Sequence, residues 1–139
     1  KEGIVHAYVH ANGSVGAMVE LFCETDFVAR NEIFKELAHD VAMQVAAAEP
    51  LYLKPENIPA EFLEKEKEIY RAELTAEGKP EAIMDKIVEG KLAKYYGEVC
   101  LMNQVFIKDE DKTMADLIND RIVTLGEKVE IGRFCRFAI

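Results

Sequence analysis

Two runs of alternating apolar residues stand near the start of the chain, on either side of Asn12-Gly13. Asn-Gly tolerates the positive φ angles of a type I′ turn, which joins two antiparallel strands through a two-residue loop. We therefore expect residues 3–24 to form a β-hairpin whose register places Tyr8 opposite Ala17. Both faces of this ribbon carry apolar residues, which predicts a position between two layers.

The period of the apolar residues changes after residue 30. From Asn31 onward they recur at steps of three and four, which places them on one face of an α-helix. Asn31 is a suitable N-cap and Pro50 cannot continue the helix, so we expect this helix to span residues 31–48.

Two further helical patterns follow a proline-containing loop, over residues 60–76 and 81–96. Gly78 and Pro80 between them supply a helix end and a helix start, so the connection is short. Helices joined in this way lie antiparallel. Their apolar stripes are narrow and their other faces strongly charged, so residues 59–97 are predicted to form a two-helix arm that protrudes from the body.

The remaining residues complete the domain. Residues 100–108 have an extended pattern, Thr113 is a suitable N-cap for a helix closed by Gly126, and residues 129–139 alternate as a final strand, so that residues 113–139 form a C-terminal helix and strand. Strands at both ends with helices between them predict an α+β fold with a small antiparallel sheet. At 139 residues the chain has the size of a single domain.

Composition argues against several classes of function. The net charge of −9 argues against a nucleic-acid binder, because affinity for phosphate backbones comes from clustered Lys and Arg. No apolar run reaches the roughly 20 residues that cross a bilayer. No Gly-rich loop precedes Lys and Ser or Thr, and the three cysteines lack CxxC spacing. We therefore expect reduced thiols in a cytosolic protein, and no bound nucleotide, cofactor or metal.

Cys23 is the residue that suggests covalent chemistry. A thiol enzyme needs its thiolate beside a histidine, and His6 and His39 are the candidates. A small buried side chain is the commoner role of such a cysteine. His6 and His10 do not make a metal site, since four residues along a strand span about 13 Å.

The junction between the hairpin and the first helix contains Glu24, Thr25, Asp26 and Phe27. Asp and Thr before a helix commonly accept hydrogen bonds from its free N–H groups, and capping or turn formation is the expected role of Asp26. A general acid–base pair of Glu24 and Asp26 needs a concave pocket. Phe27 is unusual where turns favour small polar residues. It either packs as a staple against the first helical turn or stands exposed as an aromatic anchor for a partner.

The segment "VELFCETDFVARNEIF" resembles the signature of the elongation factor Ts family, the guanine-nucleotide exchange factors of elongation factor Tu. The segment "GKPEAIMDKIVEGKLAKYYGEVCLMNQVFIKD" is similar to the coiled-coil arm of that family and the segment leaving it, and "RFCRFAI" resembles the ending of its short members. The resemblance covers essentially the whole chain. It implies a core, or dimerisation, domain over residues 1–139, without the small N-terminal helical domain with which the family begins.

The resemblance also implies site residues. Thr25, Asp26, Phe27 and Val28 correspond to the motif that contacts elongation factor Tu near its Mg²⁺ site and promotes release of GDP. His10 matches a histidine of the family's second module that is implicated in binding the same partner. These residues form the predicted partner-binding site.

Short family members with a single hairpin-plus-helix module are expected to form homodimers, so the resemblance implies a symmetric cytoplasmic dimer. Cys135 on the last strand then either pairs with its twin across the two-fold axis or stays a buried free thiol. In this interpretation the protein is not an enzyme. The alternatives are a homodimerisation module without exchange activity of its own and a thiol enzyme that uses Cys23.

Overall fold

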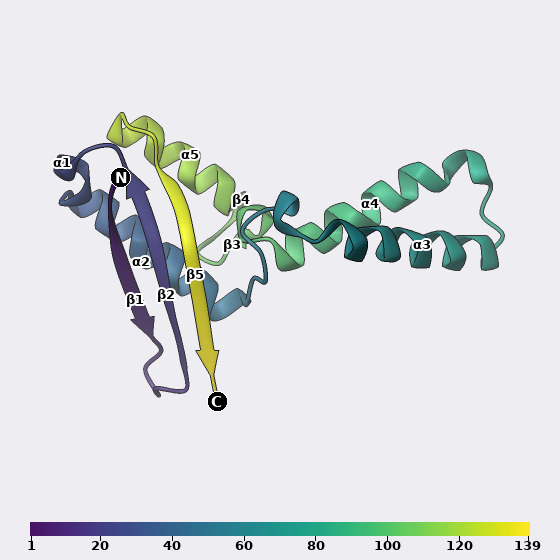
Figure 1. Cartoon of the computed structure of the whole chain (residues 1–139), viewed down its shortest axis with the longest axis horizontal. Helices are drawn as coiled ribbons and strands as arrows, with labels where there is room; N and C mark the ends of the chain where they lie inside the picture. The colour runs from purple at the N-terminus through teal and green to yellow at the C-terminus, as the bar shows by residue number, and fades with distance from the viewer.

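The sheet begins with the expected hairpin. In the computed structural model, which describes all 139 residues, β1 (Glu2–Val9) pairs antiparallel with β2 (Val15–Cys23), and Tyr8 lies opposite Ala17 as predicted. The third strand, β5 (Glu130–Ala138), pairs with the other edge of β2, so the strand order is β1-β2-β5 (Figure 1). Strands from both ends of the chain therefore form one antiparallel sheet.

The hairpin loop differs from the predicted type I′ turn. Of its residues only Gly13 has a positive φ, 75°, whereas a type I′ turn needs positive values at both central positions. The carbonyl of His10 accepts a hydrogen bond from the Gly13 N–H at 2.7 Å. Asn12 Oδ1 accepts hydrogen bonds from the backbone N–H and the hydroxyl of Ser14. Asn12 thus supports a longer loop through its side chain, and the expected register is preserved.

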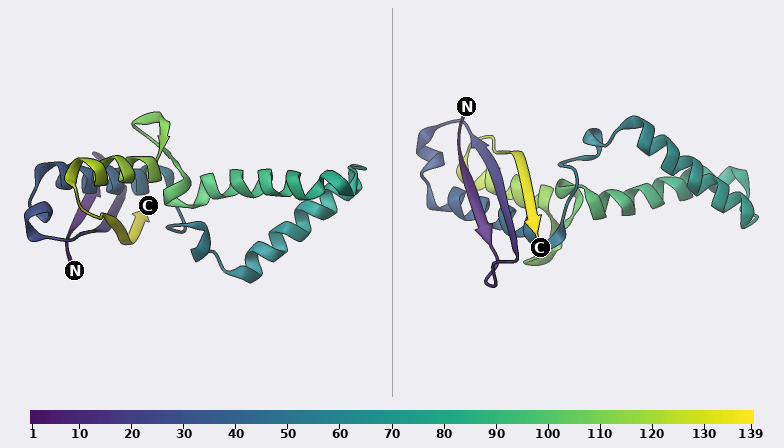
Figure 2. Two further views of the ribbon diagram at one scale, coloured as in Figure 1. Left: turned by 90° about the horizontal axis from the view of Figure 1, so that it is seen from above. Right: turned by 60° about the horizontal axis from the view of Figure 1, so that its bottom comes forward.

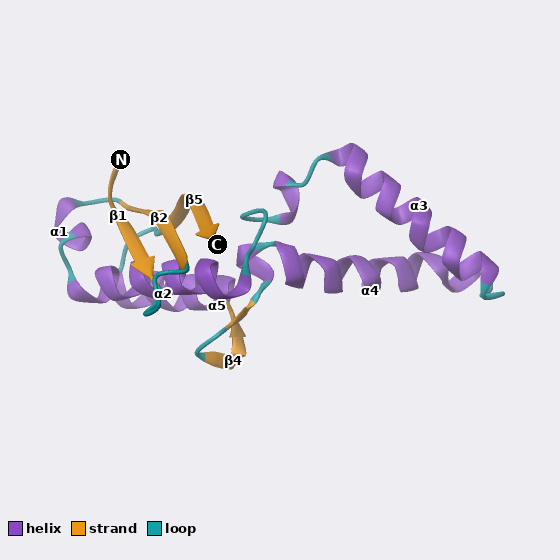
Figure 3. Cartoon of the chain, turned by 90° about the horizontal axis from the view of Figure 1, so that it is seen from below, coloured by secondary structure: helices purple, strands orange, loops and turns teal.

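One face of the sheet is covered and the other is bare. α2 (Glu32–Ala48) packs against the sheet, and α5 (Met114–Leu125) lies beside α2 on the same side (Figure 3). The main core lies between this face and the two helices, and its fully buried side chains include Val19, Leu21, Phe34, Leu37, Val41, Met114 and Leu117. No layer covers the opposite face, so the prediction of two covering layers is wrong for a single chain.

α2 and α5 begin at the residues expected to cap them, and α5 also ends at its expected cap, whereas α4 (Glu81–Val99) continues three residues beyond its expected end at residue 96. At the start of α2, Asn31 Oδ1 accepts a hydrogen bond from the Ile33 N–H at 2.7 Å. Thr113 and Asp116 exchange hydrogen bonds in a capping box at the start of α5. α5 ends at Gly126, whose φ of 73° turns the chain out of the helix at no steric cost.

The predicted arm consists of α3 (Ala60–Ala76) and α4 (Glu81–Val99), which protrude from the body (Figures 1 and 2). The two helices lie closest near the tip and separate toward the body (Figure 3). They share a small cluster of buried residues that is separate from the main core: Leu74, Met84, Val88 and Leu92. The predicted α+β fold with a protruding helical arm is thus confirmed. None of the helices is long and apolar enough to span a membrane.

Residues 100–108 are less regular than the predicted extended segment. A 3-10 turn at Leu101–Asn103 is followed by β3 (Val105–Phe106), which pairs with β4 (Asp109–Thr113) in a separate two-stranded sheet. Gln104, which stands between the 3-10 turn and β3 in the sequence, is buried. Its side-chain amide donates hydrogen bonds to carbonyls at the ends of α2 and α4. A buried amide needs such partners, and here the α2 carbonyl lies 56 residues away in the sequence whereas the α4 carbonyl lies only 6 residues away.

Candidate partner-binding site

β2 leads into a one-turn helix, α1 (Asp26–Ala29), that the sequence patterns did not predict. Thr25 is its N-cap, and the Thr25 hydroxyl accepts a hydrogen bond from the Val28 N–H at 3.3 Å. Val28 and Ala29 are buried in the main core. The turn therefore has an inner side that anchors it and an outer side that faces solvent, at one end of the sheet (Figure 1).

Phe27 lies on the outer side of α1 and is 83% exposed. A ring this exposed gains little of the roughly 1.5–3 kcal/mol that full burial of such a side chain contributes. It does not fold back onto the first turn of α2 or onto the sheet, so the staple interpretation is wrong. Of the two alternatives left by the sequence, the exposed position of the ring is the one that the structure shows, and its role as an anchor for a partner stays a prediction.

Asp26 is exposed as well, and it does not cap the helix. It is the first residue of α1, and its Oδ2 pairs with Arg30 Nη2 at 2.9 Å. The predicted capping role belongs to Thr25 because the chain already turns into a helix at Asp26. An exposed ion pair of this kind contributes less than about 1 kcal/mol. The Asp26 carboxylate can therefore leave Arg30 at little cost and bind a group of another protein.

The backbone just before α1 is held by the loop between α5 and β5. Glu127 Oε1 accepts hydrogen bonds from the backbone N–H groups of Glu24 and Thr25, both at 3.1 Å, and Oε2 accepts one from the Thr25 hydroxyl at 2.6 Å. In return, the Glu24 carboxylate accepts a hydrogen bond from the Lys128 N–H at 2.8 Å. The hydroxyl and the two amides lower the pKa of Glu127, which keeps this carboxylate charged.

Sequence reasoning missed this arrangement because Thr25 and Glu127 are 102 positions apart. No local pattern marks Glu127 as a partner of Thr25. The capping role of Thr25, in contrast, could have been found from its place just before a short run of helix-compatible residues.

Cys23 lacks the surroundings of a catalytic thiol. It is buried, its Sγ donates a hydrogen bond to the Thr25 carbonyl at 3.2 Å, and burial, followed by the nearby Glu127, raises its pKa. His6 pairs instead with His39, at 3.1 Å between Nε2 and Nδ1. The thiol-enzyme alternative therefore has neither an activated thiolate nor a histidine base. The chain also has no group of three or more His, Cys, Asp or Glu side chains placed to hold a metal ion.

His10 lies at the opposite end of the sheet from α1. It directly follows β1, and its Nδ1 is 2.9 Å from the Tyr8 hydroxyl oxygen. β1 has 8 residues, so roughly 25 Å of strand separates His10 from α1. The structure thus brings residues 25–28 together in one turn and leaves His10 apart from them.

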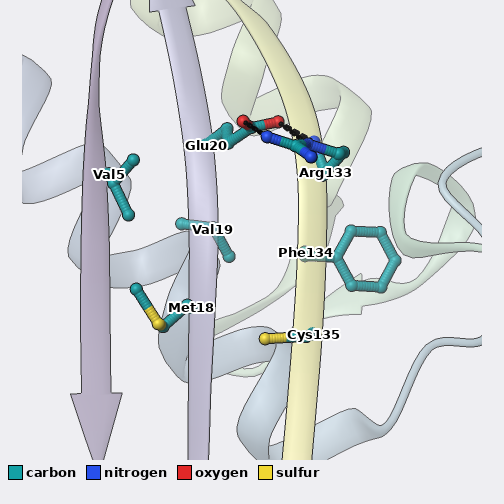
Figure 4. Close-up of a pocket in the computed structure, with 7 residues that line it drawn as sticks. All are labelled: Val5, Met18, Val19, Glu20, Arg133, Phe134 and Cys135. Carbon is teal, nitrogen blue, oxygen red and sulfur yellow. Dashed lines mark hydrogen bonds and ion pairs between the residues drawn. The ribbon is translucent and has the colours of Figure 1, made fainter.

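The bare face of the sheet carries a second group of exposed apolar side chains. Val5, Met18 and Phe137 are 62%, 48% and 76% exposed. Cys135 lies opposite Met18 in the register of β2 and β5 and is itself exposed, so the predicted burial of this thiol is wrong. A cavity of about 370 Å³ on this face is lined by Val5, Met18, Val19, Glu20, Arg133, Phe134 and Cys135. Figure 4 shows how these residues lie on the three strands.

Glu20 of β2 and Arg133 of β5 form an ion pair at one end of this cavity (Figure 4). The Glu20 carboxylate accepts hydrogen bonds from Arg133 Nε at 3.0 Å, from Nη2 at 2.7 Å and from the backbone N–H at 2.7 Å. Hydrogen bonding to Arg133 lowers the pKa of Glu20 to about 2. The two charges neutralise each other, which leaves the face predominantly apolar.

Comparison with known proteins gives the relatives of this chain. The sequence model of a family described as Elongation factor TS matches residues 1–139. The elongation factor Ts of Maridesulfovibrio salexigens is 61% identical over 135 residues, which are 97% of this chain and 66% of that protein. Those of Thermotoga petrophila and Syntrophus aciditrophicus are 55% and 57% identical over 139 residues, which are 100% of this chain and 69% of each relative. The chain thus spans about two thirds of the length of these relatives.

Proposed function

The chain belongs to the elongation factor Ts family, and on this basis we propose that it is the core domain of a guanine-nucleotide exchange factor that promotes release of GDP from elongation factor Tu. The observation that carries the proposal is Phe27, 83% exposed on a turn whose other side, Val28 and Ala29, is buried. Aromatic anchors that fill a pocket of the partner carry much of the binding energy at interfaces, and an exposed ring on an anchored turn is placed to act as one.

Each residue of the motif has a role in this proposal that its environment supports. Phe27 enters an apolar pocket of the partner. Asp26 exchanges its exposed ion pair with Arg30 for polar groups near the Mg²⁺ site of elongation factor Tu. Thr25 caps the turn and Val28 anchors it, so these two residues position the other two.

Exchange of this kind needs no chemical reaction, and in this proposal the protein is not an enzyme. Elongation factor Tu holds GDP through Mg²⁺ and through backbone groups around the phosphates. Insertion of Phe27 and Asp26 disturbs both sets of contacts and so lowers the affinity for GDP. Linkage requires that GDP in turn weaken binding of the exchange factor by the same free energy. Incoming nucleotide therefore releases the factor, which itself binds no nucleotide and works in the cytoplasm.

Release of labelled GDP from elongation factor Tu tests the proposal. We expect the protein to accelerate release and Phe27→Ala to reduce this acceleration by at least about tenfold, as truncation of a hot spot does. Asp26→Ala should have a smaller effect, because its ion pair is exposed. Leu51→Ala is the matched control, since Leu51 is 61% exposed but lies in the loop after α2. Full activity of both motif variants, with the fold intact, contradicts the proposal.

His10 enters the proposal as a separate contact. It lies at the far end of β1 from α1, so it would bind a different region of elongation factor Tu from the one that receives Phe27. His10→Ala in the same assay should reduce the acceleration independently of Phe27→Ala, with effects on the free energy of activation that add.

A second observation supports a homodimer. The bare sheet face exposes Val5, Met18 and Phe137 around Cys135. Two such faces packed across a two-fold axis would cover these side chains and supply the missing second layer, as in sheet-on-sheet packing. Cys135 of each copy would then lie near the axis. The alternative, a dimerisation module without exchange activity, predicts a dimer that leaves GDP release unchanged.

A further inference from the structure

The hydroxyl of Thr25 makes two hydrogen bonds, and the direction of one determines the direction of the other. It donates its hydrogen to Glu127 Oε2 at 2.6 Å, and it accepts a hydrogen bond from the Val28 N–H at 3.3 Å. A hydroxyl has one hydrogen and two lone pairs. Because Glu127 takes the hydrogen, a lone pair stays directed at the N–H that begins α1. Glu127 thus orients the N-cap of the turn that carries Phe27.

The same carboxylate also holds the backbone. Its Oε1 accepts hydrogen bonds from the N–H groups of Glu24 and Thr25, the two residues between β2 and α1. Lys128 donates its N–H to the Glu24 carboxylate, so each of the two loops supplies at least one donor and one acceptor to the other. Gly126, in the left-handed region, turns the chain out of α5 just before Glu127.

α1 is too short to hold its own orientation. It has 4 residues, and the first turn of a helix is unfavourable to form in isolation. Phe27 faces solvent and adds nothing to its stability. The direction in which Phe27 points therefore depends on the buried Val28 and Ala29 below it and on the hydrogen bonds to Glu127 before it.

We propose that Glu127 is a positioning residue for partner binding: it holds the entrance of α1 so that Phe27 is presented in a fixed direction before the partner arrives. The proposal rests on the proposed function of Phe27. A turn that is ordered in advance avoids the ordering cost on binding, so loss of the Glu127 contacts weakens association with elongation factor Tu.

A spectroscopic experiment tests the positioning without the partner. The chain contains no tryptophan, so Phe27→Trp places a single fluorophore at the site. In this background Glu127→Gln should increase the fast depolarisation of the tryptophan, because the amide is uncharged and its NH2 group, which can only donate, leaves the hydrogen of the Thr25 hydroxyl without its acceptor. Thr25→Val should have the same effect, whereas Thr25→Ser, which keeps the hydroxyl, should not. Asp120→Asn is the matched control: it makes the same acid-to-amide change on α5, where it breaks an exposed pair with Lys112.

GDP release from elongation factor Tu supplies the functional readout. In the protein with Phe27 intact, Glu127→Gln should raise the concentration for half-maximal release by about tenfold, as expected for loss of hydrogen bonds to a charged group. The limiting rate should change little, since Phe27 and Asp26 are unaltered. The double variant with Thr25→Val should be less impaired than the sum of the two single effects predicts, because both single variants remove the hydrogen bond between the Thr25 hydroxyl and Glu127.

The outcomes separate the two proposals. If Glu127→Gln changes neither the depolarisation nor the half-maximal concentration, the positioning role is wrong. If it changes the depolarisation while Phe27→Ala keeps full exchange activity, the positioning of α1 stands and the proposed function fails. A change in both readouts that Thr25→Val reproduces and Asp120→Asn does not supports the positioning role.

Discussion

The three histidines of the chain belong to one connected group on β1, the hairpin loop and α2. His6 Nε2 lies 3.1 Å from His39 Nδ1, and the ring of Tyr8 stands edge-on to that of His39 with 5.6 Å between centroids. A hydrogen bond between two imidazoles needs one donor and one acceptor nitrogen, so at most one ring of the pair carries a charge. Burial, followed by the neighbouring His39, accordingly lowers the pKa of His6.

We predict that stability falls as the pH drops below the ordinary pKa of histidine, about 6.5. Because the pKa of His6 is lower in the folded than in the unfolded protein, the unfolded state binds this proton first. The contribution of neutral His6 to the free energy of unfolding is complete above the pKa of His6 in the unfolded protein. It is lost as the pH falls through that value towards the pKa of His6 in the folded protein. Urea unfolding at about pH 7.5 and about pH 5.5 measures the difference.

His6→Gln should weaken this pH dependence, and His10→Gln, which changes a histidine outside the pair, should retain it. An undiminished pH dependence in His6→Gln would assign the effect to other groups.

At the scale of elements, the arm and the body are held together by separate hydrophobic clusters. Four buried residues pack between α3 and α4, whereas 20 form the main core around α2 and the sheet. The arm is also displaced from the body along the chain's long axis (Figure 1). Its helices therefore depend on a small cluster that the body does not share.

We predict that Leu74→Ala loosens the arm and leaves the body intact. Leu74 is 2% exposed, and truncation of a buried leucine costs about 2–5 kcal/mol. Hydrogen exchange should show faster exchange of amides in α3 and α4, with protection retained in α2 and β2. Leu117→Ala, in the main core, should instead reduce protection throughout the body. Equal loss of protection in both parts after Leu74→Ala would mean that they unfold together.

For the whole molecule, the decisive feature is that one chain covers only one face of its sheet. The bare face exposes apolar side chains from all three strands, among them Val5, Met18 and Phe137. α1 lies at the end of the sheet, outside this face (Figure 3). A dimer formed through the bare face would therefore leave both copies of Phe27 free to bind a partner.

We predict that sedimentation at several concentrations shows a dimer, and that Met18→Glu raises its dissociation constant at least about tenfold, because a charge is costly to bury in an apolar interface. Leu51→Glu is the control at an exposed position outside the sheet. Without reductant, a linked dimer in the parent protein and none in Cys135→Ser would place the two thiols at the axis. A concentration-independent monomer contradicts the dimer.

Most strands and helices of this protein could be predicted from the sequence because their causes are local. Asn31 and Gly126 act on backbone groups within a few residues, and the register of the hairpin follows from the alternation on either side of its loop. α1 was missed because a single turn is too short to show a period. The irregular structure around Gln104 does not follow from the local pattern, because its side chain is held partly by Gln44 and Ala48 of α2, 60 and 56 residues away.

Some features of the candidate site could likewise be predicted from the sequence, and others could not. The motif of residues 25–28 was recognisable from the sequence through its resemblance to a family signature, and so was the choice of Phe27 as the residue to test. The exposure of Phe27, its support by Glu127 and the bare face of the sheet became known from the tertiary structure. Burial and long-range hydrogen bonds belong to pairs of segments that only folding brings together, so no local pattern contains them.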